Sequence, residues 1–243
     1  KKWSFDGALS DIKQAIAIQD LPIYTQLEGD IHYLKQDYNS ALASYKKVNE
    51  SNIRSASTIF TEAKTLEMLE TPAEEVLVLM DSCVAQFNKP YSADAAPYLI
   101  ERARVRMEAK QARNAVLDYD ECYAALLGNV NDGFYNLRGQ ACLESKQYQR
   151  ALDDFTKAIE LNPRELTYYS ELAYVNMRVG RNQEAIDVLK KSLKIDAEYA
   201  EGYRLIGVAY LQLKQNAEAC EYFNKAKELG DTNVDTLIEK YCK

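Results

Sequence analysis

A repeat of 34 residues is the feature that most limits how this chain can fold. Three consecutive segments, which begin at Tyr135, Tyr169 and Tyr203, share one order of small and large apolar residues. A small residue of this pattern recurs along the whole length, as Ala8, Ala41, Val76, Ala115, Ala151, Ala185 and Ala219, at gaps of 33, 35, 39, 36, 34 and 34 residues. Such a period indicates a repeat architecture, in which each unit buries its apolar face against its neighbours.

Two further positions keep the same register. A second small residue precedes the first, as Gly29, Ala63, Ala103, Gly139, Ala173 and Gly207. A large apolar residue follows it, as Ile12, Tyr45, Met80, Tyr119, Phe155, Leu189 and Phe223. Small residues on both helices allow close approach, and the large residue one turn later fills the gap beside the crossing. The pattern therefore predicts two antiparallel helices in each repeat.

Composition agrees with an all-α fold. The chain has 243 residues, with only nine Gly and five Pro, and Ala, Leu, Glu, Lys and Gln are plentiful. No run of six or more residues shows the alternation of a half-buried strand. The longest apolar run, Val76 to Met80, is too short to cross a membrane. We therefore expect no integral membrane segment in this chain.

The pattern resembles the tetratricopeptide repeat family, most strongly from Tyr135 to Asp231, and the resemblance covers almost the whole chain. It implies a right-handed α-solenoid of stacked helical hairpins with a C-terminal capping helix. The expected units are residues 1–20 (the second helix of a truncated repeat), 21–53, a divergent repeat at 54–89, 90–130 with a preceding loop, 131–164, 165–198, 199–231, and a capping helix at 232–243.

The first stretch, KKWSFDGALSDIKQAIAIQD, aligns with a second helix and has no first helix before it. We therefore expect the gene to encode at least one more helix upstream of Lys1. The longest gap in the register contains FNKPYSADAAP, residues 87–97, where two prolines predict an extended loop.

Charge and motifs argue against nucleic-acid binding, metal binding and catalysis. The net charge is −7, and the one basic cluster, residues 101–113, has no companion, which argues against a nucleic-acid surface. No His or Cys spacing suits zinc, and no Gly-rich phosphate loop is present. The single histidine, His32, is interpreted as structural, and Asp153 and Asp154 point about 100° apart on a helix. We expect no enzyme activity and no cofactor.

Three arginines stand where the family more often has apolar residues: Arg102, Arg106 and Arg138. A buried unpaired guanidinium is costly. One interpretation pairs them with Asp118, Asp120 or Asp154 of second helices; the other makes them an anion site.

By resemblance, the function is a binding scaffold that holds a peptide or protein segment in its concave face, formed by the first helices. The Lys and Asn pair with which chaperone-binding members clamp a terminal carboxylate is absent: the matching positions carry Gln26 and Asp30, Asn136 and Gln140, or Ser170 and Tyr174. The alternative is a structural subunit of a larger assembly, such as one of the cell envelope, that packs through its convex face or its ends; VLVLM at 76–80 is the one feature that favours it.

Inward-facing positions of the first helices predict the groove. Its expected residues are Gln26, Asp30, Tyr33, Lys64, Arg104, Met107, Glu108, Asn136, Gln140, Leu143, Ser170, Tyr174, Met177, Arg178, Arg204, Val208 and Leu211. Tyr, Arg and Met suit a binding surface. This mixture predicts a peptide with an apolar anchor and an acidic residue.

The five cysteines divide by position. Cys220 and Cys242 stand eleven residues before and after Asp231, so antiparallel arms bring them level, and we predict a disulfide, with two free thiols as the alternative. Cys83, Cys122 and Cys142 occupy core positions and are expected to be buried and reduced. A bridge would favour an exported compartment, periplasmic in a bacterium, over the cytoplasm, and the tail resembles those of exported bacterial repeat proteins. The compartment stays open.

Overall fold

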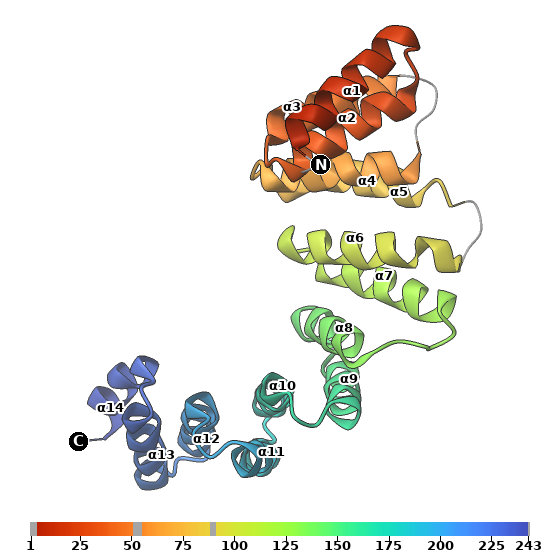
Figure 1. The fold of residues 1–243 in the computed structure, drawn as a ribbon. Helices are drawn as coiled ribbons and strands as arrows, with labels where there is room; N and C mark the ends of the chain where they lie inside the picture. The colour runs from red at the N-terminus through yellow and green to blue at the C-terminus, as the bar shows by residue number, and fades with distance from the viewer. Residues whose placement is uncertain (1–3, 51–54, 88–90, 243) are drawn as a thin grey trace. The chain divides into compact units, whose positions relative to one another are not determined.

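The computed structural model describes residues 4–50, 55–87 and 91–242 (Figure 1). Residues 1–3, 51–54, 88–90 and 243 lie outside this description, and with them parts of the expected units 1–20, 21–53, 54–89, 90–130 and 232–243 and of the loop 87–97. The described residues contain fourteen α-helices and two short 3₁₀-helices, with no strand. The predicted class, an all-α protein of stacked helical hairpins, is confirmed.

The chain divides into two compact units, residues 1–129 and 130–243. The first contains α1 (Phe5–Ile18), α2 (Pro22–Leu34), α3 (Tyr38–Glu50), α4 (Ala56–Met68), α5 (Ala73–Val84), η1 (Ala93–Ala95), α6 (Ala96–Glu108) and α7 (Ala112–Ala125). Helices α2 and α3, α4 and α5, and α6 and α7 form hairpins, and each second helix packs on the first helix of the next hairpin. Local caps support the boundaries: the Ser55 hydroxyl, for example, accepts a hydrogen bond from the backbone of Thr58 at the start of α4.

The second unit follows the same plan. It contains α8 (Asp132–Glu144), α9 (Tyr148–Leu161), α10 (Leu166–Arg178), α11 (Asn182–Ile195), α12 (Ala200–Gln212), α13 (Asn216–Glu228), η2 (Thr232–Val234) and α14 (Asp235–Tyr241). Helices α8 and α9, α10 and α11, and α12 and α13 pair as hairpins, and α14 packs on α13. The first helices α8, α10 and α12 are also in contact in sequence order.

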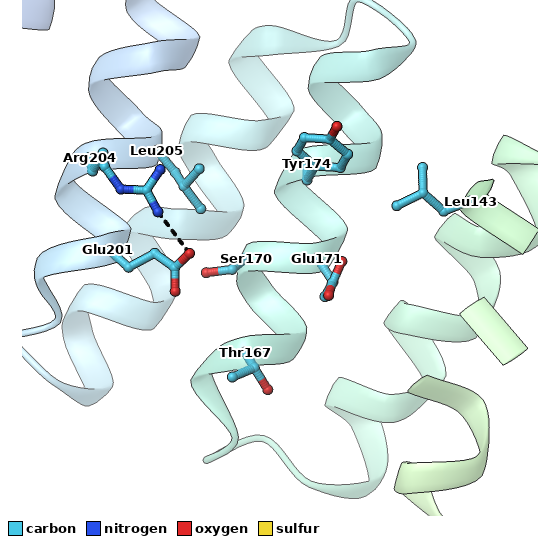
Figure 2. Close-up of a pocket in the computed structure, with 8 residues that line it drawn as sticks. All are labelled: Leu143, Thr167, Ser170, Glu171, Tyr174, Glu201, Arg204 and Leu205. Atoms are coloured by element: carbon cyan, nitrogen blue, oxygen red, sulfur yellow. Dashed lines mark hydrogen bonds and ion pairs between the residues drawn. The ribbon is translucent and has the colours of Figure 1, made fainter. Parts of the chain in front are cut away.

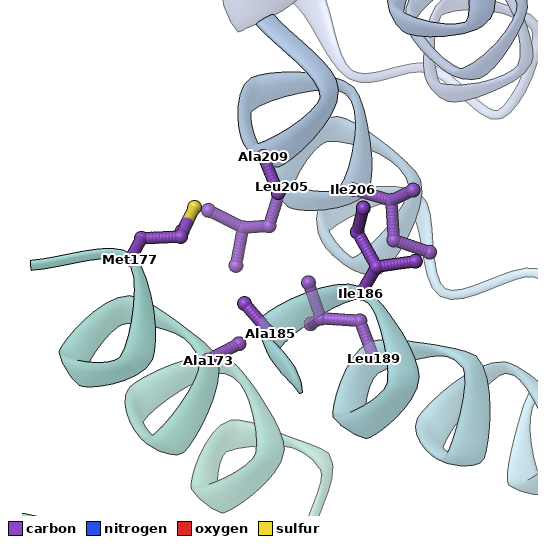
Figure 3. Packing of buried hydrophobic residues seen from close by; sticks show 8 residues of the cluster. All are labelled: Ala173, Met177, Ala185, Ile186, Leu189, Leu205, Ile206 and Ala209. Atoms are coloured by element: carbon purple, nitrogen blue, oxygen red, sulfur yellow. The ribbon is translucent and has the colours of Figure 1, made fainter. Parts of the chain in front are cut away.

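The core follows the register of the sequence. In the second unit, Ala173 and Leu189 lie beside Ile206 and Ala209 in one buried cluster that joins the hairpin α10–α11 to α12 (Figure 3). In the first unit, Ala63, Val76 and Met80 form the matching cluster of α4 and α5. The predicted burial of Cys83, Cys122 and Cys142 is confirmed, since all three are free thiols that are fully enclosed. Burial raises the pKa of Cys83 and of Cys122 to about 11.

Buried ion pairs decide between the two interpretations of Arg102, Arg106 and Arg138. Asp118, which is 1% exposed, accepts hydrogen bonds from Arg102 Nη2 at 2.6 Å and from Arg106 Nη1 at 2.7 Å. Arg138 donates two hydrogen bonds to Asp154, from Nε at 2.9 Å and from Nη2 at 2.7 Å. The predicted pairing with Asp118 and Asp154 is confirmed, and these guanidinium groups hold each hairpin together instead of facing a ligand.

Candidate functional site

A pocket of about 400 Å³ opens over the three first helices of the second unit (Figure 2). Helix α10 stands in the middle, with α8 on one side and α12 on the other. The residues that line the pocket are Leu143 of α8, Thr167, Ser170, Glu171 and Tyr174 of α10, and Glu201, Arg204 and Leu205 of α12. The pocket therefore combines apolar, aromatic, hydroxyl and charged side chains on a fixed helical platform.

Helix α10 supplies the central row. Thr167, Ser170, Glu171 and Tyr174 follow the i, i+3, i+4, i+7 spacing that places side chains on one helical face. Ala173, on the neighbouring face, packs into the core of the hairpin, whereas the row lines the pocket. Tyr174 keeps 44% of its surface exposed, which is unusual for a large aromatic ring in this unit. It is the main apolar surface that the pocket offers to a partner.

Helix α12 supplies a neutralised cation. Arg204 donates from Nε to Asp231 at 2.8 Å and from Nη2 to Glu201 at 2.9 Å. The Asp231 side chain is only 7% exposed, so this ion pair fixes the guanidinium in place. Arg204 thus lines the pocket, but two carboxylates already compensate its charge. It is poorly placed to attract an acidic ligand.

The carboxylate of Glu171 is in the opposite situation. Its one hydrogen bond comes from Gln140 Nε2 at 3.1 Å. Among the described residues, no Lys or Arg side chain forms an ion pair with it. Burial raises the pKa of the Glu171 carboxyl, and the nearby charge of Glu201 raises it further. The pocket therefore holds a half-buried carboxylate without a cation.

The structure distributes the other expected groove residues over several environments. Ser170 is 8% exposed, and its hydroxyl lies 2.6 Å from that of Tyr199. Met177 does not line the pocket: it is 7% exposed and packs with Ala173 and Leu205 (Figure 3), because it lies one turn after Ala173 on the packing face of α10. Val208 is half-buried against the cores on either side of α12, whereas Arg178 is exposed at the end of α10.

Seven expected groove residues belong to the first unit, and four of them are Tyr33, Lys64, Arg104 and Met107. Lys64 and Arg104 join α4 to α6 in a network with Glu67 and Glu101, where Lys64 Nζ lies 2.6 Å from Glu101 Oε1. Tyr33 packs edge-on against the ring of Tyr38, with centroids 5.5 Å apart. The fourth, Met107, is half-buried near the end of α6. Both cations of this face are therefore already paired with carboxylates.

Asn136 and Gln140 are two further expected groove residues, both on α8. The Asn136 Oδ1 atom is buried and has no hydrogen-bond partner among the described residues. Gln140 stands outside the pocket lining but orients Glu171 through the hydrogen bond described above.

Sequence reasoning missed Thr167, Glu171, Glu201 and Leu205. The signal for two of them was available, because Thr167 and Glu171 precede Tyr174 by seven and three residues and so share its face. The same signal was available for Glu201, because it precedes Arg204, an expected groove residue, by three residues. Leu205 follows Arg204 directly, and adjacent helical residues point about 100° apart, so no such signal marked it.

Other kinds of site find little support in the described part of the chain. It contains no group of three or more His, Cys, Asp or Glu side chains that could hold a metal ion. None of its helices is both long and apolar enough to cross a membrane. His32 has its Nδ1 atom 3.1 Å from Asp37 Oδ2, which fits a structural contact. Of VLVLM at 76–80, Val76, Leu77 and Met80 are buried and Val78 is exposed.

Comparison with known families identifies the type of repeat. Models described as "Tetratricopeptide repeat" match residues 134–165 and 170–234. The chain carries tetratricopeptide repeats. Every residue that lines the pocket, apart from Thr167, lies within these matched repeats.

A curated relative and two solved structures extend the comparison. Hsp70-Hsp90 organizing protein 2 of Arabidopsis thaliana is 29% identical over 241 residues, which are 98% of this chain and 41% of that protein. The chain spans less than half the length of this relative and of other curated relatives that it matches. The C-terminal part of a TPR protein from Cytophaga hutchinsonii has a TM-score of 0.75 at 14% identity, with 97% of this chain and 93% of that chain covered.

YrrB, described as a TPR protein with an unusual peptide-binding site, has a TM-score of 0.62 at 19% identity. The match covers 81% of this chain and 97% of YrrB. At these identities the two solved structures support the fold alone.

Proposed function

We propose that this scaffold binds a peptide or protein segment in the pocket over α8, α10 and α12, without catalysing a reaction. The single observation that carries the proposal is the pocket itself, about 400 Å³ in volume and bounded by the inward faces of three consecutive first helices. Stacked hairpins hold these helices in place before a ligand arrives, so little ordering entropy is lost on binding.

The lining suits a side chain of a protein partner. Tyr174 presents an exposed ring, and Leu143 and Leu205 provide apolar contacts on the two sides. Tyrosine is among the residue types that dominate binding energy at interfaces. The name of the Arabidopsis relative, an organizing protein for Hsp70 and Hsp90, and the peptide-binding site in the description of YrrB support a protein ligand.

A chaperone tail with a free terminal carboxylate is a poor candidate for this pocket. The Lys and Asn pair that would clamp it is missing at Ser170 and Tyr174, and Arg204 is engaged with Asp231 and Glu201. A carboxylate would also approach Glu171 and Glu201, and like charges repel.

Peptide selection tests the proposal. A random nonapeptide library displayed on phage is selected on the immobilised chain, and enriched peptides are synthesised and titrated against the wild type and Tyr174→Ala. We expect the affinity to fall about tenfold, which corresponds to roughly 1.4 kcal/mol for a buried aromatic contact. Leu161→Ala is the matched control, because Leu161 of α9 is 49% exposed, close to the 44% of Tyr174, and lies outside the pocket.

Circular dichroism of each variant establishes that it remains folded. If no peptide is enriched, or if Tyr174→Ala binds the enriched peptides as tightly as Leu161→Ala does, the pocket is not where this chain binds.

A further inference from the structure

We propose that the pocket over α8, α10 and α12 accepts a lysine or arginine side chain of the bound segment, with its charge at Glu171 and its aliphatic chain against Tyr174 and Leu143. This inference rests on the proposed function and names the chemistry of its ligand. It reverses the acidic residue that the sequence predicts for the ligand.

Charge balance is the first argument. The pocket lining contains two carboxylates, Glu171 and Glu201, and one guanidinium, Arg204. Asp231 lies directly behind Arg204 and bonds to it at 2.8 Å. Three carboxylates therefore face one cation, and that cation already contacts two of them. The uncompensated charge of the pocket is negative, and it is complementary to a basic side chain.

The position of the unpaired charge is the second argument. Glu171 and Tyr174 are three residues apart on α10, and Leu143 projects toward them from α8 (Figure 2). A carboxylate can accept about four hydrogen bonds, yet Glu171 receives a single one, from an amide. Taking a carboxylate partly out of water without a cation is unfavourable. A basic side chain would supply the missing charge-assisted hydrogen bonds.

The aromatic ring is the third argument. Lysine and arginine carry an apolar stem that packs along apolar surface while the charged group stays at a polar site. Tyr174 is exposed and stands one turn from Glu171, so its ring can contact the stem or the face of the cation. An apolar ligand alone would leave Glu171 buried without compensation, and an acidic ligand would add repulsion.

A protein segment fits this site better than a metal ion. Calcium needs six to eight oxygen ligands and magnesium an octahedral set, whereas the described residues offer no cluster of three metal-binding side chains. The open row along α10, from Thr167 to Tyr174, spans two helical turns and suits an extended chain with one basic side chain directed inward.

The test compares the binding of two peptides, one with a basic residue and one with norleucine in its place, to the wild type and two variants. Peptides selected on the wild-type chain of 243 residues are expected to be enriched in Lys or Arg at one position. The best peptide is then synthesised with that residue and with norleucine in its place, and both are titrated against wild type, Glu171→Gln and Glu160→Gln. Glu160 of α9 is the control, since its charge is paired with Lys157 at 2.9 Å, outside the pocket.

We expect norleucine to weaken binding to the wild type about tenfold or more, as for a hydrogen bond between charged groups. Glu171→Gln should lose the same factor for the basic peptide and show no preference for it over norleucine, while Glu160→Gln behaves as the wild type. The thermal midpoint of Glu171→Gln at pH 7 should not fall, because the buried charge that it removes opposes folding.

Two results would overturn the inference and leave the proposed function standing. One is peptides that depend on Tyr174 but carry no basic excess. The other is a basic preference that Glu171→Gln retains. Enrichment of no peptide at all would instead sink the proposed function and this inference together.

Discussion

At the crossing of the two helices in a repeat, the size of one side chain sets the size of the side chain opposite. Glycine faces the largest rings: a Cβ on Gly29 would come within 2.7 Å of Tyr45, and one on Gly139 within 2.9 Å of Phe155. Where the second helix carries Leu189, the matching position is Ala173. The choice between Gly and Ala therefore follows the size of the opposite side chain in five of the six hairpins, the exception being Ala103, which stands opposite Tyr119 in the register.

Gly207 makes this requirement measurable. A Cβ at Gly207 would lie 2.5 Å from Cε1 of Phe223, whose ring is fully buried, and 3.1 Å from the carbonyl of Ala219. Overpacking of this kind costs about 1–3 kcal/mol. We predict that Gly207→Ala lowers the free energy of unfolding by that amount in urea titrations followed by circular dichroism.

A second glycine is the internal control for that measurement. In α8, a Cβ on Gly133 would meet only Asn131 Oδ1, at an ordinary 3.6 Å. Gly133→Ala should therefore stabilise the chain by about 0.5–1 kcal/mol through reduced backbone entropy. Equal effects of the two substitutions would contradict the crossing argument.

At the residue scale, some side-chain contacts could be predicted from the sequence and others could not. The pairs of Arg102 and Arg138 with Asp118 and Asp154 were predictable, because each partner sits sixteen residues later in a repeating register and a buried guanidinium needs one. The uncompensated charge of Glu171 could not be predicted from the sequence. It arises because Arg204 forms its ion pairs with Asp231 and Glu201, and only the three-dimensional structure shows that pairing. Met177, an expected groove residue, packs into the core instead, because it lies one turn after Ala173 on α10.

At the scale of the element, the short helix α14 closes the second unit. Leu237 and Ile238 pack against a buried cluster that contains Phe223 and Val234. The structure joins Cys220 of α13 to Cys242, with Cα atoms 5.5 Å apart and a sequence separation of 22 residues. Seven helical residues are too few to be stable alone, so α14 depends on these contacts.

Thiol counting tests the bridge itself. We predict three free thiols in the denatured, unreduced protein, those of Cys83, Cys122 and Cys142, whereas five would show that no disulfide forms. In the chain-entropy model a loop of this length contributes about 3 kcal/mol. The double variant Cys220→Ser/Cys242→Ser should lose that amount in urea titrations, and faster amide exchange should appear in α14.

Reduction is the control for that variant. A reducing agent should bring the wild type to the stability of the double variant and leave the double variant unchanged. A loss of stability that reduction does not reproduce would assign the effect to the serine substitutions.

At the scale of the whole molecule, stability and binding are both local. In a repeat protein each repeat contacts only its neighbours, so the free energy of unfolding is roughly a sum over repeats and the interfaces between them. The clusters around Leu189 and around Phe223 lie within residues 130–243, as does every residue of the pocket. We predict that the fragment 130–243 folds on its own and binds the selected peptides with the affinity of the full chain.

The affinities of fragment and full chain should agree within about 0.5 kcal/mol, or roughly twofold, the usual limit for independent parts. Circular dichroism and a cooperative urea transition of the fragment establish folding, and titration of the best peptide measures binding. Glu171→Gln introduced into the fragment should abolish the preference for a basic residue as it does in the full chain. A folded fragment that binds more than tenfold weaker would show that residues 1–129 contribute directly to the ligand site, and an unfolded fragment would show that the second unit depends on the first for stability.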